Sequence, residues 1–484
     1  MSTESWDPVL VMINDFVYSK KHYSDYPIET LTLARLALKD ALCCSIESIS
    51  KSVVCRSLLG PVIPGTIVPN GVKIPGTSHQ VDPVKGAFDL GTAIRFLDHD
   101  DVLGGLEWGH PADNLGALLV ISDYLCRTRQ SAVTIGTLLE ALIKAYEIQG
   151  VMLIRNAFNA RGLDHVVLVK TASAAVVSWL MGLDKKQGLA VLSHVFMDNV
   201  PLRVYRHGSN TIPRKGWAAG DACSRAIQLN MLVQAGQPGA PSVLTAPKWG
   251  FYDSVWGGKP FEFPINPHDW AMKNVFFKLM PVEGHSISAI EACLAHHGHL
   301  MATYGLSAYK HIGKVKVRTS SAANMLINKE GPLRNPADRD HCMQYILAVT
   351  LVKGAAPVAE DFFDDSLFQT TDLVEVLRKK ITVEESNEFT KRYYDLNIKS
   401  LPCAVSIDMD DGTSTGEKLV EFPIGHTKNP KTIPALRSKF WENMSLMYPD
   451  HRVGEIESIV QNHTDTPVSH LMDLMFCPVA TTKL

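Results

Sequence analysis

Residues 29–49 read ETLTLARLALKDALCCSIESI, and this stretch indicates the fold class. Its apolar residues recur every three or four positions, as on one face of an α-helix: Leu31, Leu33, Ala34, Leu36, Ala37, Ala41 and Leu42. Arg35 and Lys39 are expected on the outward face. Residues 138–148, 165–181 and 186–197 show the same spacing, so we predict a large helical region in the first half of the chain.

The pattern changes after about residue 275. Residues 312–320 alternate apolar and polar side chains like a strand, and residues 403–409 and 418–422 flank a hairpin turn at Asp410-Asp411-Gly412. Helical patterns return after Pro423, at residues 433–447 and 453–461. We predict a mainly α fold with an α+β part. A helical domain would span residues 1–275, an α+β lid domain 276–424, and C-terminal helices 425–484 would return to the helical domain.

Composition excludes several classes of protein. The 484 residues carry a formal net charge of −3 without a basic arm, so we expect no nucleic-acid partner. No uncharged apolar stretch approaches the ~18 to 20 residues that span a bilayer, so we expect no membrane segment. The nine cysteines include no CxxC pair, which predicts reduced thiols rather than disulfides, a cysteine-ligated zinc site or an iron–sulfur cluster.

The chain ends bear on location. The first fifteen residues contain Glu4, Asp7 and Asp15, and the first arginine is Arg35, a pattern unlike a secretory or mitochondrial presequence. We therefore expect a cytoplasmic protein. The last residues, Thr482-Lys483-Leu484, resemble a peroxisomal Ser-Lys-Leu signal with threonine in place of serine, which makes the peroxisome the alternative.

Titratable residues are concentrated in FLDHDDVLGGLEWGHPADN, residues 96–114. Such a segment fits a solvated loop, a metal site or an acid/base site. The His99-Asp100 dipeptide occurs in metal-dependent phosphohydrolases of the HD type, but those sites need further ligands on separate helices, and no HExxH is present. We predict no metal. The residues of this segment alone leave the solvated loop and the acid/base site open.

Basic residues downstream indicate an anionic substrate. Residues 205–221 contain Arg206, His207, Arg214 and Lys215 shortly before a helix that opens near Trp217. Arginine, lysine and helix N-termini bind carboxylates. Each basic stretch alone also fits a solvated face, but together they favour a polycarboxylate site. No Walker, Rossmann or GxSxG motif occurs, so neither a nucleotide nor a serine hydrolase is implied.

Several strings resemble the 2-methylcitrate dehydratase family, also called MmgE/PrpD. They are LDHDD and EWGHPADNLGA near residues 97–117, RGLDHVVLVK (161–170), YRHGSNT (205–211), RKGWAAGDACSRA (214–226), LTAPKWGFYD (244–253), NPADRDHCMQY (335–345) and EFPIGH (421–426). The resemblance covers about residues 10–475. It implies a helical domain with an α+β lid, a homodimer, no cofactor and a tricarboxylate substrate.

The same resemblance implies a set of site residues. The catalytic set comprises Asp98, His110, His165, Lys278, His285 and Tyr345, with His110 or Asp98 as the base/acid pair. We therefore expect Asp98 and His110 to point into an active site, with His99 and Asp100 as solvated or supporting neighbours. The substrate-binding set comprises Arg206, His207, Arg214 and Lys215. The reaction would remove a proton beside a carboxylate and eliminate a β-hydroxyl group, with cationic groups stabilising the carboxylates.

Departures from the family pattern bear on substrate size. Val102 replaces a threonine, Leu103 a tryptophan, Gly104 and Gly105 larger residues, and Gly284 a phenylalanine. We therefore expect Val102, Leu103, Gly104 and Gly284 to border an enlarged pocket for a longer alkyl chain, in a secondary metabolic enzyme. Residues elsewhere that refill the space would leave ordinary methylcitrate activity.

Two other functions stay open at this point. The chemistry that stabilises a carbanion beside carboxylates also serves a cis-aconitate-type decarboxylase, although EWGHP and RKGWAAGD favour dehydration. A non-catalytic binding or partner homologue would follow if the threonine that Val102 replaces were essential.

Overall fold

The computed structural model describes residues 5–19, 21–128, 132–198, 200–206 and 210–477. Its larger part is helical, and this confirms the predicted class. The helices are α1 (Pro8–Val17), α2 (Ile28–Lys51), α3 (Val53–Leu58), α4 (Pro83–Arg95), α5 (Leu115–Thr128), α6 (Ile135–Leu153), α7 (Val166–Leu180), α8 (Lys185–Met197), α9 (Ala218–Gln234) and α10 (Trp270–Asn274). Short strand pairs also occur here: β1 (Val72–Lys73) with β2 (Gln80–Val81), and β3 (Leu103–Gly104) with β4 (Trp108–Gly109).

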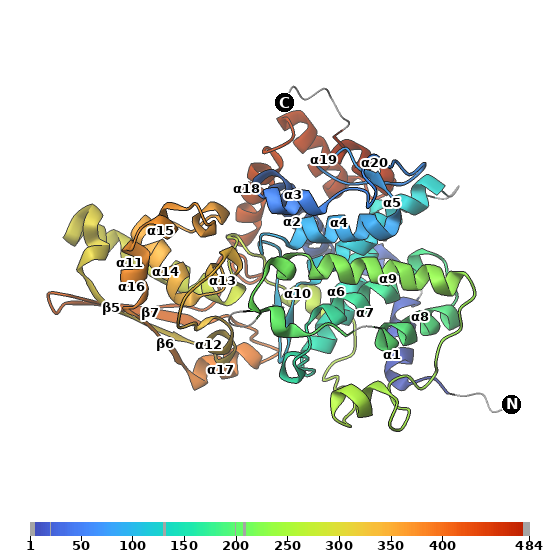
Figure 1. The fold of residues 1–484 in the computed structure, drawn as a ribbon, viewed down its shortest axis with the longest axis horizontal. Helices are drawn as coiled ribbons and strands as arrows, with labels where there is room; N and C mark the ends of the chain where they lie inside the picture. Colours follow the sequence, from blue (N-terminus) through green and yellow to red (C-terminus); the bar gives the residue numbers. More distant parts are fainter. Residues whose placement is uncertain (1–4, 20, 129–131, 199, 207–209, 478–484) are drawn as a thin grey trace.

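A smaller α+β part follows (Figure 1, left). Its sheet has the strand order β6-β5-β7-β8, in which β5 and β6 are parallel and the other pairs are antiparallel. The strands are β5 (Ile312–Thr319), β6 (Ile381–Glu385), β7 (Cys403–Met409) and β8 (Ser414–Val420). The helices are α11 (Ile287–Tyr304), α12 (Ser321–Ile327), α13 (Pro336–Arg339), α14 (Met343–Lys353), α15 (Leu367–Thr370), α16 (Leu373–Arg378) and α17 (Asn387–Tyr394).

The chain then returns to the helical part through α18 (Thr432–Met444), α19 (Asp450–Asn462) and α20 (Val468–Met475). These helices lie beside α2, α3 and α5 (Figure 1), and Phe440 and Leu471 join the same hydrophobic core as the first helices. The domain boundaries at residues 275 and 424 stay a prediction. No helix in the described residues is long and apolar enough to cross a membrane.

The returning helices correct one expectation for α2. Lys39 was expected to face outward, but only 6% of it is exposed because α18 and α19 pack against this helix. Its ammonium lies 3.5 Å from Glu457 in α19. The periodicity of one helix shows its most apolar side but not how many neighbours surround it.

Candidate active site

The acidic segment after α4 is buried rather than solvated. Asp98, Asp100, Asp101 and Asp113 are each at most 1% exposed, and His110 is 5% exposed. This excludes the solvated-loop interpretation, and it also corrects the expectation that His99 and Asp100 could be solvated. Buried carboxylates need cations or hydrogen-bond donors, so the partners of this segment define the site.

Asp98 is surrounded by cations. Arg95 Nη1 lies 2.6 Å from Asp98 Oδ1, Lys278 Nζ donates to the same carboxylate, and Lys215 Nζ lies 3.6 Å from Oδ2. Burial would raise the pKa of Asp98, but the charges of Arg95 and Lys278 hold it well below its usual range. Asp98 is therefore an ionised carboxylate that organises cations and not a proton donor at neutral pH.

His110 is a neutral imidazole with both ring nitrogens engaged. Nδ1 donates to the carbonyl oxygen of Asp101 over 2.6 Å, and Nε2 accepts from Arg95 Nη2 over 2.9 Å. Burial and then the Arg95 charge lower the pKa of His110 well below its ordinary value. This imidazole orients Arg95, and its own lone pair is already occupied.

His165 immediately precedes α7 and lies beside His110, with 5.7 Å between the ring centroids. Among the described residues, neither ring nitrogen of His165 makes a hydrogen bond. Burial lowers its pKa well below the ordinary value, against the nearby Asp164 carboxylate, which raises it. The side chain is thus a neutral imidazole with an unoccupied lone pair, as a general base requires.

These groups open into a cavity of about 400 Å³ between the helical part and the α+β part. The helical part contributes Arg95, Asp98, His110, His165, Arg203 and Arg206, and the smaller part contributes Glu283, Lys329, Arg334 and His341. The lining also includes the apolar side chains of Trp108, Met325, Leu326, Pro332 and Leu333. The cavity therefore combines arginines with apolar side chains, which suits an anion that carries a hydrocarbon group.

Two arginines beside His165 are positioned to bind an anion. Arg206 Nε donates to Asp164 Oδ2 over 2.5 Å, which fixes its guanidinium. Arg203 packs over the Trp108 ring at 4.9 Å, and its Nη1 has no hydrogen-bond partner among the described residues. A buried guanidinium with an unpaired donor binds a carboxylate well.

The comparisons with known proteins agree with this geometry. Residues 12–264 match the MmgE/PrpD N-terminal domain, and residues 280–465 match the MmgE/PrpD C-terminal domain. The chain belongs to the MmgE/PrpD family. This confirms the resemblance drawn from the sequence strings.

Curated relatives in this family are named as dehydratases. An alkylcitrate dehydratase phiI from a fungal species is 48% identical over 92% of this chain and 89% of its own length. A 2-methylcitrate dehydratase-like protein oryR from Aspergillus oryzae is 47% identical, covering 93% of this chain and 92% of the relative. The 2-methylcitrate dehydratase of Escherichia coli K12 is 41% identical over 97% of each chain.

Not every residue inferred from the MmgE/PrpD resemblance reaches the main cavity. Tyr345 is buried in the core of the smaller part, where its hydroxyl accepts from Gln369 Nε2 over 2.6 Å. Arg214 stacks on Trp217 and pairs with Asp221, and His207 lies outside the described residues. Lys215 lies behind the cavity wall, 2.7 Å from Asp340.

His285 borders a second, smaller cavity of about 40 Å³. Its Nδ1 lies 2.8 Å from Glu283 Oε1, and its Nε2 lies 3.0 Å from the Tyr393 hydroxyl. Gly284 borders both cavities, so this short segment forms the partition between them. His285 therefore supports Glu283 and the partition and does not face the main cavity.

The expected enlargement near residues 102–104 and 284 is largely filled. A Cβ on Gly104 would collide with the Tyr393 hydroxyl, and a Cβ on Gly284 would lie 2.9 Å from Val102 Cγ1. Leu103 belongs to the main hydrophobic core and is 1% exposed. Tyr393 and Val102 thus occupy part of the space beside these glycines. Val102, Gly104 and Gly284 still border the smaller cavity, so an enlarged pocket at these positions stays a prediction.

Arg95, Arg203 and His341 are site residues that the sequence analysis missed. Arg95 precedes Asp98 by three residues at the end of α4, and Arg203 precedes Arg206 by three. His341 stands inside the NPADRDHCMQY string next to Asp340. The acidic residue near Arg95 and beside His341 in the sequence was a usable signal, whereas Arg203 has no acidic neighbour in the sequence. Only the tertiary structure shows which side chains share the cavity.

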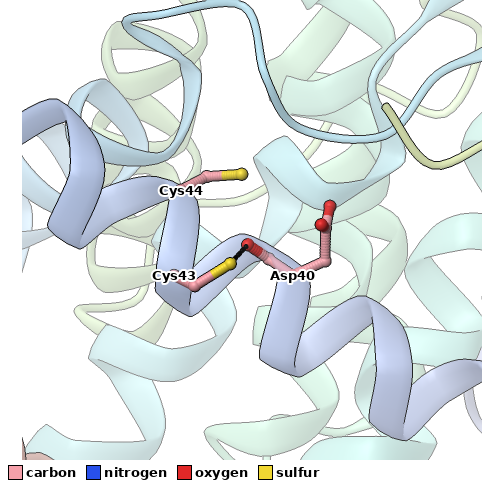
Figure 2. Close-up of side chains that lie close together, drawn as sticks. All are labelled: Asp40, Cys43 and Cys44. Carbon is pink, nitrogen blue, oxygen red and sulfur yellow. Dashed lines mark hydrogen bonds between the residues drawn. The ribbon is translucent and has the colours of Figure 1, made fainter. Parts of the chain in front are cut away.

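Three groups of described residues have the donor types of a metal site: Asp98, Asp340 and His341; Asp98, Asp100 and His110; and Asp40, Cys43 and Cys44 (Figure 2). In each group, a carboxylate already pairs with the cationic side chain of a neighbouring residue. Lys215 Nζ lies 2.7 Å from Asp340, Arg95 pairs with Asp98, and Lys439 Nζ lies 2.7 Å from Asp40. These ammonium and guanidinium groups supply the positive charge that the carboxylates need, and they disfavour a metal ion there.

Proposed function

We propose that this protein is a hydro-lyase that removes water from 2-methylcitrate or a longer 2-alkylcitrate to give the corresponding cis-aconitate. The observation that carries the proposal is the His165 imidazole in the same cavity as Arg95, Arg203 and Arg206. Its Nδ1 lies 3.3 Å from Asp164 Oδ1, and its Nε2 makes no hydrogen bond among the described residues. Relatives named as dehydratases of these two substrates, similar over most of the chain, support it.

The proposed reaction uses the protein's own side chains. His165 removes the proton from the carbon beside a carboxylate, the electron pair of that C–H bond forms the C=C bond, and the C–O bond of the neighbouring carbon breaks. Arg203 and Arg206 hold the carboxylates and stabilise the charge that develops on the one beside the reacting carbon. Lys278 keeps Asp98 ionised, so that Asp98 in turn fixes Arg95.

The apolar lining residues support a substrate with an alkyl group. Met325, Leu326, Pro332 and Leu333 line the same cavity as the arginines, and Met325 is 64% exposed. Each CH₂ group that leaves water against these residues would contribute about 0.8 kcal/mol to binding. We infer that this segment around α12 contributes to the selection of alkyl chain length, in addition to the positions 102–104 and 284 proposed from the sequence.

The test is a dehydration assay on the purified protein in the presence of EDTA, with citrate, 2-methylcitrate and hexylcitrate as substrates. We expect the absorbance of a conjugated alkene to appear with 2-methylcitrate, hexylcitrate or both. His165→Asn should lower kcat by about 10² to 10⁴-fold while the thermal midpoint stays close to that of the wild type. No turnover of any citrate, or release of carbon dioxide from cis-aconitate, would contradict the proposal.

The assembly and location are also proposals. We propose a homodimer, as the family resemblance implies, and light scattering of the purified chain measures it. We propose a cytoplasmic location, which the nine free thiols support. Thr482-Lys483-Leu484, on which the peroxisomal alternative rests, lies outside the described residues. Imaging of the tagged full chain would separate the two locations.

A further inference from the structure

We propose that His341, held by Asp340, is the general acid that protonates the leaving hydroxyl group, and that the smaller part of the molecule delivers it to the cavity opposite His165. This inference rests on the proposed dehydratase function and extends it. It assigns the two proton transfers to imidazoles from the two parts of the chain, so that the reaction requires both parts.

The position of His341 carries the inference. The residue lies between α13 and α14, its side chain lines the main cavity, and it remains 21% exposed. Its Nδ1 lies 2.7 Å from Asp340 Oδ1 and 3.0 Å from Lys215 Nζ. Its Nε2 lies 3.3 Å from Asp98 Oδ2. A carboxylate thus holds one ring nitrogen, and the other is directed toward the acidic corner of the cavity, as in other acid/base imidazoles.

Asp98 and the other two imidazoles of the cavity have other roles. Asp98 is held ionised by Arg95 and Lys278. His110 has one ring nitrogen on a carbonyl oxygen and the other on Arg95. His165 is the base in the proposed reaction. Among the imidazoles that line this cavity in the described residues, His341 is the one that remains for the second proton transfer.

The charges around His341 explain how it would gain its proton. Burial and then Lys215 lower the pKa of His341, while Asp340 and Asp98 raise it. Glu283 also faces this imidazole, and Arg95 and Lys278 lie beyond Asp98. The net effect in the protein alone is a lowered pKa of His341. A bound tricarboxylate adds negative charge to the cavity and raises the pKa of the imidazole from this lowered value. Substrate binding would therefore protonate His341 before the hydroxyl group leaves.

The proton balance closes without a cofactor. His165 gains the proton from carbon, and His341 gives its proton to the oxygen as the C–O bond breaks, so the products are the alkene and water. The two imidazoles then return to their starting forms by exchanging protons with solvent. No oxidant, reductant or further co-reactant is needed.

The test compares two leaving groups. His341→Asn and His165→Asn are assayed with 2-methylcitrate and with its analogue in which fluorine replaces the leaving hydroxyl group. Fluoride leaves as an anion, so loss of the acid should matter little for it. We expect His341→Asn to lower kcat for 2-methylcitrate by about 10² to 10⁴-fold and for the fluoro analogue by less than about 10-fold. His165→Asn should slow both substrates.

Further measurements separate the possible failures. His341→Gln repeats the test if the asparagine variant does not fold, and Asp340→Asn, which alters a positioning residue, should shift the pH profile of kcat. Wild-type enzyme without activity on any citrate overturns the proposed function and this inference together. An active wild type whose His341 variants slow both substrates equally, or keep kcat within about 10-fold on 2-methylcitrate, overturns the inference alone.

Discussion

Asp98 is the residue around which the site is organised. Its backbone has φ of +56°, a left-handed conformation that a non-glycine residue adopts only when its surroundings enforce it. The enforcing contacts come from Lys278, which donates to both the backbone carbonyl and the carboxylate, and from Arg95. The bend turns the chain from α4 into the buried segment and places His110 against Arg95.

The neighbouring His99 anchors the segment to α2, and this contact predicts a pH dependence of stability. His99 Nδ1 lies 2.6 Å from Glu47 Oε2 inside the protein. Burial raises the pKa of Glu47, but His99, together with Lys51 and Lys439, outweighs it, and the pKa falls from 4.5 to about 2. Because the folded pKa is the lower one, this contact stabilises the protein above pH ~4.5, and the stabilisation is lost as the pH falls toward ~2.

Glu47→Gln should therefore lower the free energy of unfolding by about 3 kcal/mol at pH 6, and the difference from wild type should shrink between pH ~4.5 and ~2. Urea unfolding across this range measures it. Glu29→Gln, at an exposed position near the start of the same helix, is the control and should leave the free energy nearly unchanged. A difference for Glu47→Gln that does not vary with pH would contradict the assignment.

At the scale of elements, close helix packing positions α4 and hence the site. A Cβ on Gly91 in α4 would lie 2.8 Å from Gly220 Cα in α9, and a Cβ on Gly116 in α5 would lie 2.7 Å from Gly91 Cα. These glycines let three backbones approach one another directly. The C-terminal end of α4 is thereby fixed against α5 and α9. This end carries Arg95, and Asp98 follows three residues later.

Gly91→Ala should destabilise the protein by about 1 to 3 kcal/mol or more, because the new methyl group meets backbone atoms that cannot rotate away. Gly298→Ala is the matched control in α11, where the added Cβ meets open space. It should instead stabilise by about 0.5 to 1 kcal/mol, since alanine favours the helix. Thermal and urea unfolding of both variants measures the contrast, and equal effects would refute the packing argument.

Helical periodicity was enough to predict most long helices, because their apolar residues are numerous and regularly spaced. Short elements were harder: β6 has only five residues, and it was not predicted, although it completes the sheet by pairing with β5. In the site, Asp98, His110 and His165 stand in distinctive strings and reach the cavity. Tyr345 and His341 share one string, but Tyr345 lies in α14 and points into the core, whereas His341 precedes α14 and lines the cavity. The residue at which α14 begins determines this difference, and the sequence pattern did not indicate it.

At the scale of the whole molecule, the returning C-terminal helices hold the active-site segment from behind. Lys439 of α18 donates to Asp40 Oδ1 in α2, to the carbonyl oxygen of His99 and to the carbonyl oxygen of Lys278, each over 2.7 Å. Burial lowers the pKa of this ammonium, but Asp40, together with the neighbouring Cys43 and Cys44, outweighs it and raises the pKa above its ordinary value. One buried cation thus joins three segments that lie far apart in the sequence.

Lys439→Met should therefore affect both stability and catalysis, although Lys439 does not line the cavity. Removal of one partner from a buried ion pair costs about 3 to 5 kcal/mol, and release of residues 99 and 278 should lower kcat by about 10-fold or more.

Lys431→Met, at an exposed position before the same helix, should change neither quantity appreciably. Asp40→Leu combined with Lys439→Met removes both charges and should recover part of the stability but not kcat, because the carbonyl oxygens of residues 99 and 278 still lack their donor. Urea unfolding and the dehydration assay on all four proteins measure these effects. If Lys439→Met behaves like Lys431→Met, the C-terminal helices do not support the active site through this cation.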